Sequence, residues 1–478
     1  MRRFTVFAIL TLAVVLTASV AGAQNTRGEL ERIAKAMGAN ALKSIEIGGS
    51  GLTYAVGQSA APNTPWPRFN LKSFTRTLDY QAGALRDELV RTQAEDPPRG
   101  GGLQPIRGEQ RQVFLMSGDY AWNVVNDAPV PAPIALADRR MQLWTSPHGV
   151  VKAALAHRGV VKDRVITFTI PGHMTVRATV DKKRLVEHVH ATIPHPVLGD
   201  LQAEIRYSDY RDFGGVKFPM KIEQSAAGFP SLDVTLTSVR PNVAVDLPVP
   251  GPVRQATSPY ARVTSERVAD GVWYITGGTH HSALIEMADH LVLVEAPLND
   301  ERTLAVLAEV RGLSPKPVRY VVNSHHHFDH SGGIRAMAGE GLTIITHEVN
   351  RPFFARVLGT PATIHPDHLT KSGKKGVVEG VRDRHVLKDG AREVEIHHIA
   401  GNAHHDGLLM VYLPKERLLI EADAFTPGPP DAPPPSPANP FHVNLADNIA
   451  RLNLAVDQIV PLHGRIVPLA ELHRMIGR

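Results

Sequence analysis

The residues best suited to chemistry stand in one short stretch, Ser324-His325-His326-His327-Phe328-Asp329-His330. Imidazole and carboxylate groups are common ligands of zinc and related metal ions. In an extended segment, side chains two positions apart point the same way, so His325 and His327 can share one ion while His326 faces away. Asp329 and His330 follow on the next turn, from which they can reach a second ion. The stretch therefore predicts a metal site.

Two histidines do not complete such a site, because a zinc ion takes three or four protein ligands. Further candidates stand downstream, each at or just past the end of an expected strand: His404, Asp423 and His463. Ligand sites in layered α/β folds gather at strand ends. We therefore expect these three side chains to join the first cluster.

The elements that must position these residues alternate between strand and helix over residues 263–478. Val318–Val322 is a largely apolar run that predicts a buried strand directly before the histidines, and Asp300–Val310 has helical spacing. Leu445–Gln458 predicts a second helix, followed by the strand Ile459–Leu462. Most of the 24 histidines lie in this region, which we expect to be an α/β layered domain.

In residues 24–240 apolar and polar residues mostly alternate with a period of two. This pattern predicts an antiparallel β-rich domain, with a helix over Arg27–Ile45. The segment Tyr207–Pro219 loosely resembles a hairpin of the curved sheets found in periplasmic lipoprotein carriers. That resemblance implies a concave face able to hold an apolar ligand, with a purely structural sheet as the alternative. We identify no catalytic constellation in this region.

Three irregular segments separate the patterned ones. The glycine-rich stretch Asp96–Gly102 is expected to be an exposed insertion, and residues 241–262 read as a proline-rich linker between the two domains. The long segment Pro427–Pro440 is either part of the mouth of the site or an exposed loop.

The N-terminus predicts export. Arg2 and Arg3 precede an apolar run, and Ala21-Gly22-Ala23 fits a signal-peptidase site, so residues 1–23 are expected to be a signal peptide. We therefore expect a periplasmic or secreted protein with no stable membrane anchor after cleavage. The chain has no cysteine, which excludes disulfides and thiolate ligands. A net charge of only +5 without a basic stripe argues against nucleic acid as a partner.

Residues 325–330 match the His-x-His-x-Asp-His signature of the metallo-β-lactamase superfamily, and the later motifs match in order and spacing. The resemblance covers roughly residues 265 to 478 and implies an αββα sandwich. It implies one metal bound by His325, His327 and His404, and a second bound by Asp329, His330 and His463, with Asp423 bridging. Asp423 stands where many lactamases carry a thiolate, so the chain is more similar to the glyoxalase-II-type branch.

The expected function is an exported hydrolase with two zinc ions, iron or manganese being alternatives. Its metal-bound hydroxide would attack the carbonyl of an ester, thioester, lactone or amide, with Asp329 as the catalytic residue. One alternative is an iron enzyme similar to the persulfide dioxygenases, using His325, His404 and Asp423. Another is a non-catalytic protein that carries a lipid-like ligand.

The substrate is expected to be a small molecule, but specificity depends on loops whose shape the composition does not reveal. His280 and His281 occupy a turn that overhangs the metals in this superfamily, so a role in substrate binding is one of two readings for them. The oligomeric state stays open.

Overall fold

The structure, a computed structural model, describes residues 26–390 and 392–478. The expected signal peptide, residues 1–23, and the cleavage site before Gln24 lie outside this part of the chain. Among the described residues, no helix is both long and apolar enough to cross a membrane.

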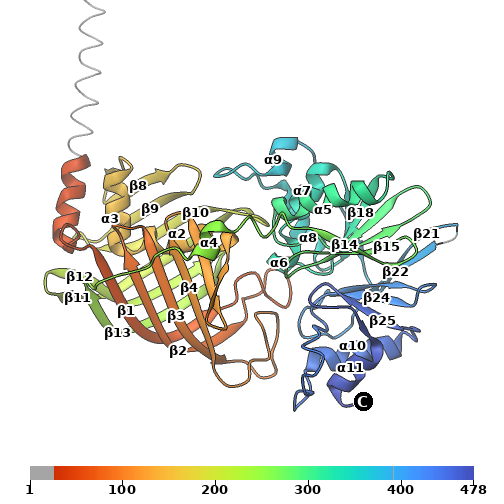
Figure 1. Ribbon diagram of the computed structural model, residues 1–478. Helices are drawn as coiled ribbons and strands as arrows, with labels where there is room; N and C mark the ends of the chain where they lie inside the picture. Colours follow the sequence, from red (N-terminus) through yellow and green to blue (C-terminus); the bar gives the residue numbers. More distant parts are fainter. Residues whose placement is uncertain (1–25, 391) are drawn as a thin grey trace, which may run out of the picture.

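The N-terminal region is built on one antiparallel sheet (Figure 1). In the described chain its thirteen strands run in the order β6-β5-β4-β3-β2-β1-β13-β12-β11-β10-β9-β8-β7, so that nearly every strand pairs with its neighbour in sequence. The strands are β1 Ser44–Tyr54, β2 Arg68–Asp79, β3 Ala84–Gln93, β4 Gln110–Ser117, β5 Tyr120–Val125, β6 Ala128–Pro131, β7 Val160–Lys162, β8 Val165–Ile170, β9 Met174–Val180, β10 Val186–His195, β11 Gly199–Phe213, β12 Val216–Ala226 and β13 Phe229–Pro241.

The sheet curves around helices that fill its inner face. The alternation of side chains along the strands explains why one face of the sheet is covered. In strand β9, every second side chain from Met174 to Val180 is buried while the others face outward. The buried faces pack with a helix over residues 26–37 and with α2, Leu136–Thr145, and α3, Pro147–Ala156, after the short helix η1, Pro133–Ala135. Helix α2 contacts both β3 and β10, which lie far apart in the sheet order. Helix side chains therefore cover the face that the carrier resemblance would leave for an apolar ligand.

The C-terminal region has two sheets. Among the described residues, seven strands form one sheet in the order β14 to β20 and six form the other in the order β21 to β26. The first sheet contains β14 Thr264–Ala269, β15 Val272–Thr276, β16 Ser282–Glu286, β17 Leu291–Val294, β18 Val318–Val322, β19 Thr343–His347 and β20 Val377–Val381. The second contains β21 Arg384–Asp389, β22 Arg392–His398, β23 Leu409–Leu413, β24 Leu418–Glu421, β25 Gln458–Pro461 and β26 Val467–Pro468.

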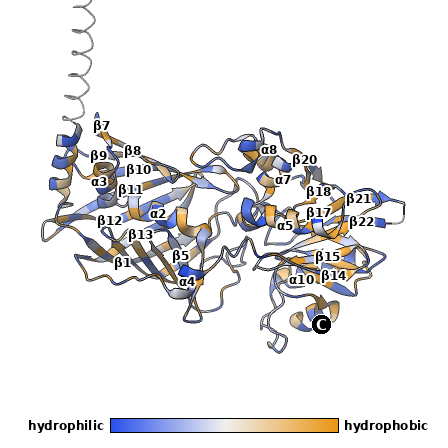
Figure 2. Ribbon diagram, turned by 45° about the horizontal axis from the view of Figure 1, so that its top comes forward, coloured by the Kyte–Doolittle hydropathy of each residue, from blue (hydrophilic) through white to orange (hydrophobic). Residues whose placement is uncertain are grey.

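Three hydrophobic clusters hold these sheets and their helices in four layers. One lies between the two sheets, with Ile285 and Val411 among its members. A second packs the first sheet against α5 Asp300–Leu313, α7 Ile334–Glu340, α8 Arg351–Gly359 and α9 His368–Ser372. A third packs the second sheet against α10 Pro440–Arg451 and α11 Leu469–Ile476. Strand β17 is buried throughout, and hydrophobic colour follows it and its neighbours in Figure 2. The predicted αββα sandwich behind a β-rich N-terminal region is confirmed.

The connection between the regions is partly ordered against the thirteen-stranded sheet of the N-terminal region. Strand β13 ends at Pro241 and β14 begins at Thr264, and the intervening chain forms the short helix α4, Gly251–Gln255. Val253 packs with Trp122 in a small hydrophobic cluster on that sheet. The helix predicted over Leu445–Gln458 is shifted in the structure, because α10 begins at Pro440 and ends at Arg451.

A buried ion pair inside the curved sheet gives a stability prediction. Arg76 and Asp87 face each other across β2 and β3, with two hydrogen bonds of 2.7 and 2.6 Å, and Arg76 also donates to Gln142 of α2. Asp87→Ala leaves the buried guanidinium without its counter-charge, so we expect it to lower the free energy of unfolding in urea by about 3 to 5 kcal/mol. Glu88→Ala is the matched control.

Glu88 is the next residue on the same strand, with its side chain 33% exposed and paired with Arg86 and Arg111 at the surface. Exposed pairs contribute about 1 kcal/mol or less. Equal losses for the two variants would contradict the stabilising role of the buried pair.

Candidate metal centre

The candidate ligands lie at one end of the two sheets, where loops leave the strands. The histidine-rich loop follows β18 and runs into the short helix α6, Phe328–Ser331. His404 follows β22, Asp423 follows β24 and His463 follows β25. Asp423 has a φ of +62°, a left-handed conformation that aspartate tolerates better than most residues. The structure thus brings together residues that span the whole C-terminal region.

The first group of ligand atoms comes from His325, His327, His404 and Asp423, all within 4.8 Å of one another. The three histidines are buried, and the Nε2 atom of His404 lies 2.9 Å from an Asp423 carboxylate oxygen. These are the residues that the family resemblance assigns to the first metal, together with the bridging carboxylate.

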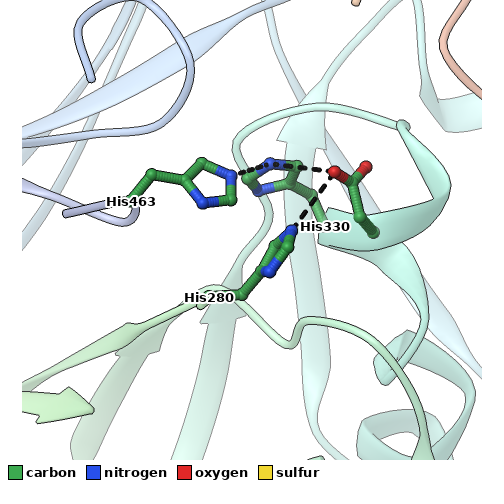
Figure 3. Close-up of side chains that lie close together, drawn as sticks. His280, His330 and His463 are labelled. Atoms are coloured by element: carbon green, nitrogen blue, oxygen red, sulfur yellow. Dashed lines mark hydrogen bonds and ion pairs between the residues drawn. The ribbon is translucent and has the colours of Figure 1, made fainter. Parts of the chain in front are cut away.

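The second group comes from Asp329, His330, His463 and also His280. Figure 3 shows the imidazoles of His280, His330 and His463 converging. Asp423 faces this group too, because its Oδ1 lies 3.0 Å from His463 and its Oδ2 lies 3.2 Å from His330. The Asp423 carboxylate therefore stands between the two groups, the position that the resemblance gives to a bridging ligand.

Hydrogen bonds to acceptors fix which imidazole nitrogen remains free. The Nε2–H of His327 donates to the Ser59 carbonyl at 2.8 Å, which leaves a buried Nδ1 with no hydrogen-bond partner among the described residues. The Nδ1–H of His330 donates to Glu295 at 3.0 Å, and the Nδ1–H of His463 donates to the Thr279 carbonyl at 3.0 Å. In each case the lone pair of the second nitrogen points into the ligand group, the arrangement that metal-binding histidines adopt.

Within each ligand group, ring nitrogens of two histidines face each other. The Nε2 atoms of His330 and His463 are 3.0 Å apart, and those of His325 and His404 are 3.4 Å apart. Two lone pairs at such distances repel, so each pair needs a proton or a metal ion between or beside its members. The buried Nδ1 of His327, which has no partner among the described residues, also needs a proton or a metal ion beside it. The donor set therefore fits divalent metal ions at both groups.

The electrostatics of the site are consistent with bound cations. Burial lowers the pKa of His325 to about 3, which keeps that ring neutral and able to coordinate. Burial also works against the charged form of His330, but the carboxylates of Asp423 and Asp329 outweigh it and raise the pKa of His330 well above its usual value. The negative field that holds a proton on His330 would equally favour a metal ion.

Glu295 is a functional residue that the sequence reasoning missed. Its buried carboxylate accepts hydrogen bonds from His330, from the Asn323 amide at 3.0 Å and from the Ser324 hydroxyl. Ser324 in turn contacts Nδ1 of His325 at 2.9 Å, so one carboxylate orients a ligand of each group. Glu295 directly follows β17 with a φ of +75°. A charged residue directly after an all-apolar strand was the available signal.

His326 and His405 do not join the ligands, in agreement with the expectation that His326 faces away. Nδ1 of His326 contacts Nε2 of His405 beneath the site, and Nδ1 of His405 accepts from the Gly407 amide at 2.9 Å. Both rings are buried. Their rings pack beneath those of His325 and His327.

A pocket of about 990 Å³ opens above the two groups. His280 and His281 both line it, but they differ in position. Nε2 of His280 lies 3.2 Å from Asp329, within the second ligand group, whereas the His281 ring packs edge-on against Tyr274. The pocket is also lined by Thr426, Pro435, Asn439 and Phe441, so the segment Pro427–Pro440 forms part of the mouth.

The N-terminal region supplies the opposite wall, which the sequence reasoning did not foresee. Gln58, Leu103 and Arg107 line the pocket, and Arg107 donates to the carbonyls of Ser436 and Pro437. The prediction that Asp96–Gly102 is an exposed insertion holds only in part: Asp96, Pro97 and Arg99 are exposed, whereas Gly100 and Gly101 are buried, the Gly100 amide donates to the Ala403 carbonyl at 2.9 Å and Gly101 lies against His327. A glycine run signals close backbone approach as well as a free loop.

Residues 275–468 match the model of the metallo-β-lactamase superfamily, and this C-terminal domain belongs to that superfamily. A curated relative is the 2,4-dinitroanisole O-demethylase subunit alpha of Nocardioides sp. (strain JS1661), 29% identical over 171 residues. The match covers 35% of this chain and 48% of that protein, so the chain spans about half the length of the relative.

Solved structures of similar fold include a metallo-β-lactamase from Pontibacter korlensis, with 19% identity and a TM-score of 0.36. It matches 45% of this chain and 98% of its own. A metallo-β-lactamase from Hirschia baltica has 20% identity and a TM-score of 0.35, over 45% of this chain and 97% of its own.

The ligand assignment predicts how metal content responds to substitution. We expect purified protein to hold about two divalent ions per chain, the number for which two ligand groups provide. His404→Ala removes a ligand of the first group and should lower that content towards one, as measured by elemental analysis after dialysis. His405→Ala is the matched control, because both of its ring nitrogens already have protein partners.

The His405 variant should therefore keep both ions, provided that its circular dichroism spectrum matches that of the wild type. Loss of metal from His405→Ala together with full retention by His404→Ala would reverse the assignment of these two neighbours.

Proposed function

We propose that the protein is a hydrolase with two zinc ions that acts on an ester, thioester, lactone or amide of a small molecule. The observation that carries the proposal is the paired ligand set, with Asp423 between the two groups at the base of a pocket. Membership of the C-terminal domain in the metallo-β-lactamase superfamily supports a metal-dependent enzyme.

Two bound zinc ions would lower the pKa of water in the site and polarise the oxygen of a substrate carbonyl. The protein's own contribution is to hold charge in place. Burial works against the ionised form of Asp329, but the neighbouring His330 and His280 keep its pKa well below the usual value, so it stays a carboxylate. Both of its oxygens have protein partners, at 2.7 Å to Gln58 and 3.2 Å to His280. This geometry suits Asp329 to orienting groups in the site more than to accepting a proton outright.

His280 is suited to hold the Asp329 carboxylate in place as an uncharged ring at the mouth of the site. Burial lowers its pKa to about 4, so the ring is uncharged near neutral pH. Its Nδ1 lies 2.9 Å from the Thr279 hydroxyl, and its Nε2 faces Asp329. The pocket wall beyond it contains apolar side chains such as Leu103 and Phe441. This lining favours a substrate whose uncharged body lies in the pocket while its reacting group reaches the ligands.

A second candidate substrate is an activated aryl methyl ether. The observation that favours it is the similarity to the 2,4-dinitroanisole O-demethylase subunit alpha, which reaches 29% identity over 171 residues. Attack of water on the ring carbon of such an ether would form a carbon–oxygen bond and release methanol, so the same two-metal site would serve both candidates. The two candidate reactions differ in the carbon that is attacked, which is a carbonyl carbon in the first and an aromatic ring carbon in the second.

A reporter panel tests the proposal. We expect zinc-loaded protein to hydrolyse at least one of an aryl ester, a thioester, a lactone, a β-lactam or 2,4-dinitroanisole. Asp329→Ala should lower kcat/KM on that reporter by about 100-fold or more, because the group that orients reactants in the site is lost. Release of phenolate or thiolate measures the rate for the aryl ester, the thioester and 2,4-dinitroanisole, and the change in absorbance on ring opening measures it for the lactone and the β-lactam.

Asp447→Ala is the control for loss of an acidic residue, because Asp447 is exposed and pairs with Arg478 at the surface. It should retain the wild-type rate. Equal turnover by the wild type and by Asp329→Ala would mean that the reaction does not use this centre. Consumption of oxygen with each turnover would favour an oxygenase over a hydrolase.

We also propose that the protein is exported and works in the periplasm or outside the cell. The support is the sequence of residues 1–23, with its paired arginines, apolar run and small-residue cleavage site. In a bacterial host with the intact leader, the soluble mature protein should begin at Gln24, as read by N-terminal sequencing of the periplasmic fraction. An uncleaved chain in the cytoplasm would contradict export.

A further inference from the structure

Two segments of the N-terminal region, residues 57–60 and 99–102, bond directly to the loops that carry the ligands. The Phe328 amide donates to the Gly57 carbonyl at 3.1 Å, and the Gly100 amide donates to the Ala403 carbonyl at 2.9 Å. The Asp406 amide donates to the Ala60 carbonyl at 2.7 Å. In Figure 1 the orange loops of the thirteen-stranded sheet accordingly reach α6. The metal centre is therefore built by both regions of the chain.

The packing around Phe328 holds the first segment in place. Its ring lies edge-on to Trp66 at 5.6 Å and to His195 at 4.7 Å, both from the N-terminal region. Gly57 has a φ of +81°, and a β-carbon there would lie 2.2 Å from the Phe328 ring. Only glycine fits this contact, so the segment approaches the ligand loop as closely as a backbone can.

Gln58 then reaches Asp329 with a defined orientation. Its Nε2–H donates to Oδ1 of Asp329 at 2.7 Å, while its Oε1 accepts from the Gly102 amide at 3.2 Å. The second contact decides the amide orientation, because a backbone amide can only donate. Gly101 closes the arrangement, since a β-carbon there would lie 2.0 Å from the Gln58 oxygen.

This contact determines which oxygen of Asp329 faces the second ligand group. Oδ1 is taken by Gln58, whereas Oδ2 lies 3.2 Å from His280 and 3.9 Å from His330. Oδ2 is therefore the oxygen turned towards the second ligand group. The next residue, Ser59, acts on the first group, since its carbonyl accepts from His327. Adjacent residues of the N-terminal region thus orient one ligand of each group.

We propose that Gln58 is a positioning residue of the second metal site, holding Asp329 so that its Oδ2 faces the other members of the second ligand group. The proposal rests on the two-metal centre of the proposed function and assigns part of that centre to the N-terminal region. Hydrogen-bond partners of metal ligands typically contribute about 10- to 100-fold in metal affinity. The amide of Gln58 should contribute within that range.

The test compares stepwise zinc affinities of the full chain. Gln58→Met keeps the size of the side chain but removes its donor and its acceptor. We expect it to weaken the second zinc ion by about 10- to 100-fold in competition with a chromophoric chelator, while the first ion binds as in the wild type. Cobalt-substituted protein should show a changed visible spectrum on addition of the second equivalent only.

Arg356→Ala is the matched control, because Arg356 makes a different contact between the regions, donating to Asn63 at 2.9 Å away from the ligands. It should bind both zinc ions as the wild type does. Gln58→Leu, which also removes the donor and the acceptor without adding charge, should weaken the second ion by a similar factor. Should Gln58→Met unfold, the same titration of Gln58→Leu decides between the outcomes.

Wild-type affinity for both ions in Gln58→Met would overturn the proposal, as would equal weakening of the two ions. These outcomes are separate from those of the reporter panel. If no reporter is hydrolysed but Gln58→Met still loses the second ion selectively, the positioning role stands and the proposed function fails. If the wild type hydrolyses a reporter and Gln58→Met binds zinc unchanged, the function stands and the positioning role fails.

Discussion

Imidazole nitrogens that face each other inside a buried site are the constraint on which the rest of this structure depends. His330 and His463 bring their Nε2 atoms to 3.0 Å, and within the described part of the chain the Nδ1 of His327 is buried without a partner. Such an arrangement is unfavourable unless positive charge occupies it. The surrounding carboxylates of Asp423, Asp329 and Glu295 supply the complementary negative field. The fold must therefore hold these side chains against their mutual repulsion until a cation compensates for it.

The layered C-terminal region provides that rigidity. The ligands stand on short loops, but each loop leaves a strand that is buried in the hydrophobic clusters between the layers. Glu295 and Ser59 then fix the rings through single hydrogen bonds, so that the lone pairs rather than the N–H groups point inward. Strand ends set the positions of the ligands, and their hydrogen-bond partners set the orientations. Both are needed because a metal ion tolerates little error in either.

The sequence predicts the parts of this centre that depend on local spacing. The motif at residues 325–330, the strand before it and the histidine and aspartate at later strand ends all follow from period and order. Glu295 and Gln58 were missed, because their roles depend on contacts 35 and 271 residues away in sequence. The helices α2 and α3, which fill the curved sheet, were also missed, and with them the reason why its inner face is covered. Asp96–Gly102 was misjudged in part because a glycine run reads the same whether it is solvated or pressed against another backbone.

The N-terminal region contributes both to the pocket wall and to the orientation of the candidate metal ligands. In a fold whose catalytic residues come from one domain, the loops at the mouth can vary without disturbing the metals. Here the segment that carries Gln58 and Ser59 orients the ligands, while the neighbouring loop with Leu103 and Arg107 forms the pocket wall. Both segments interlock through the Gly101 amide, which donates to the Gln58 carbonyl at 2.9 Å. A change in the pocket wall would therefore reach Asp329 and His327 through these contacts, which would link substrate choice to metal geometry in the proposed enzyme.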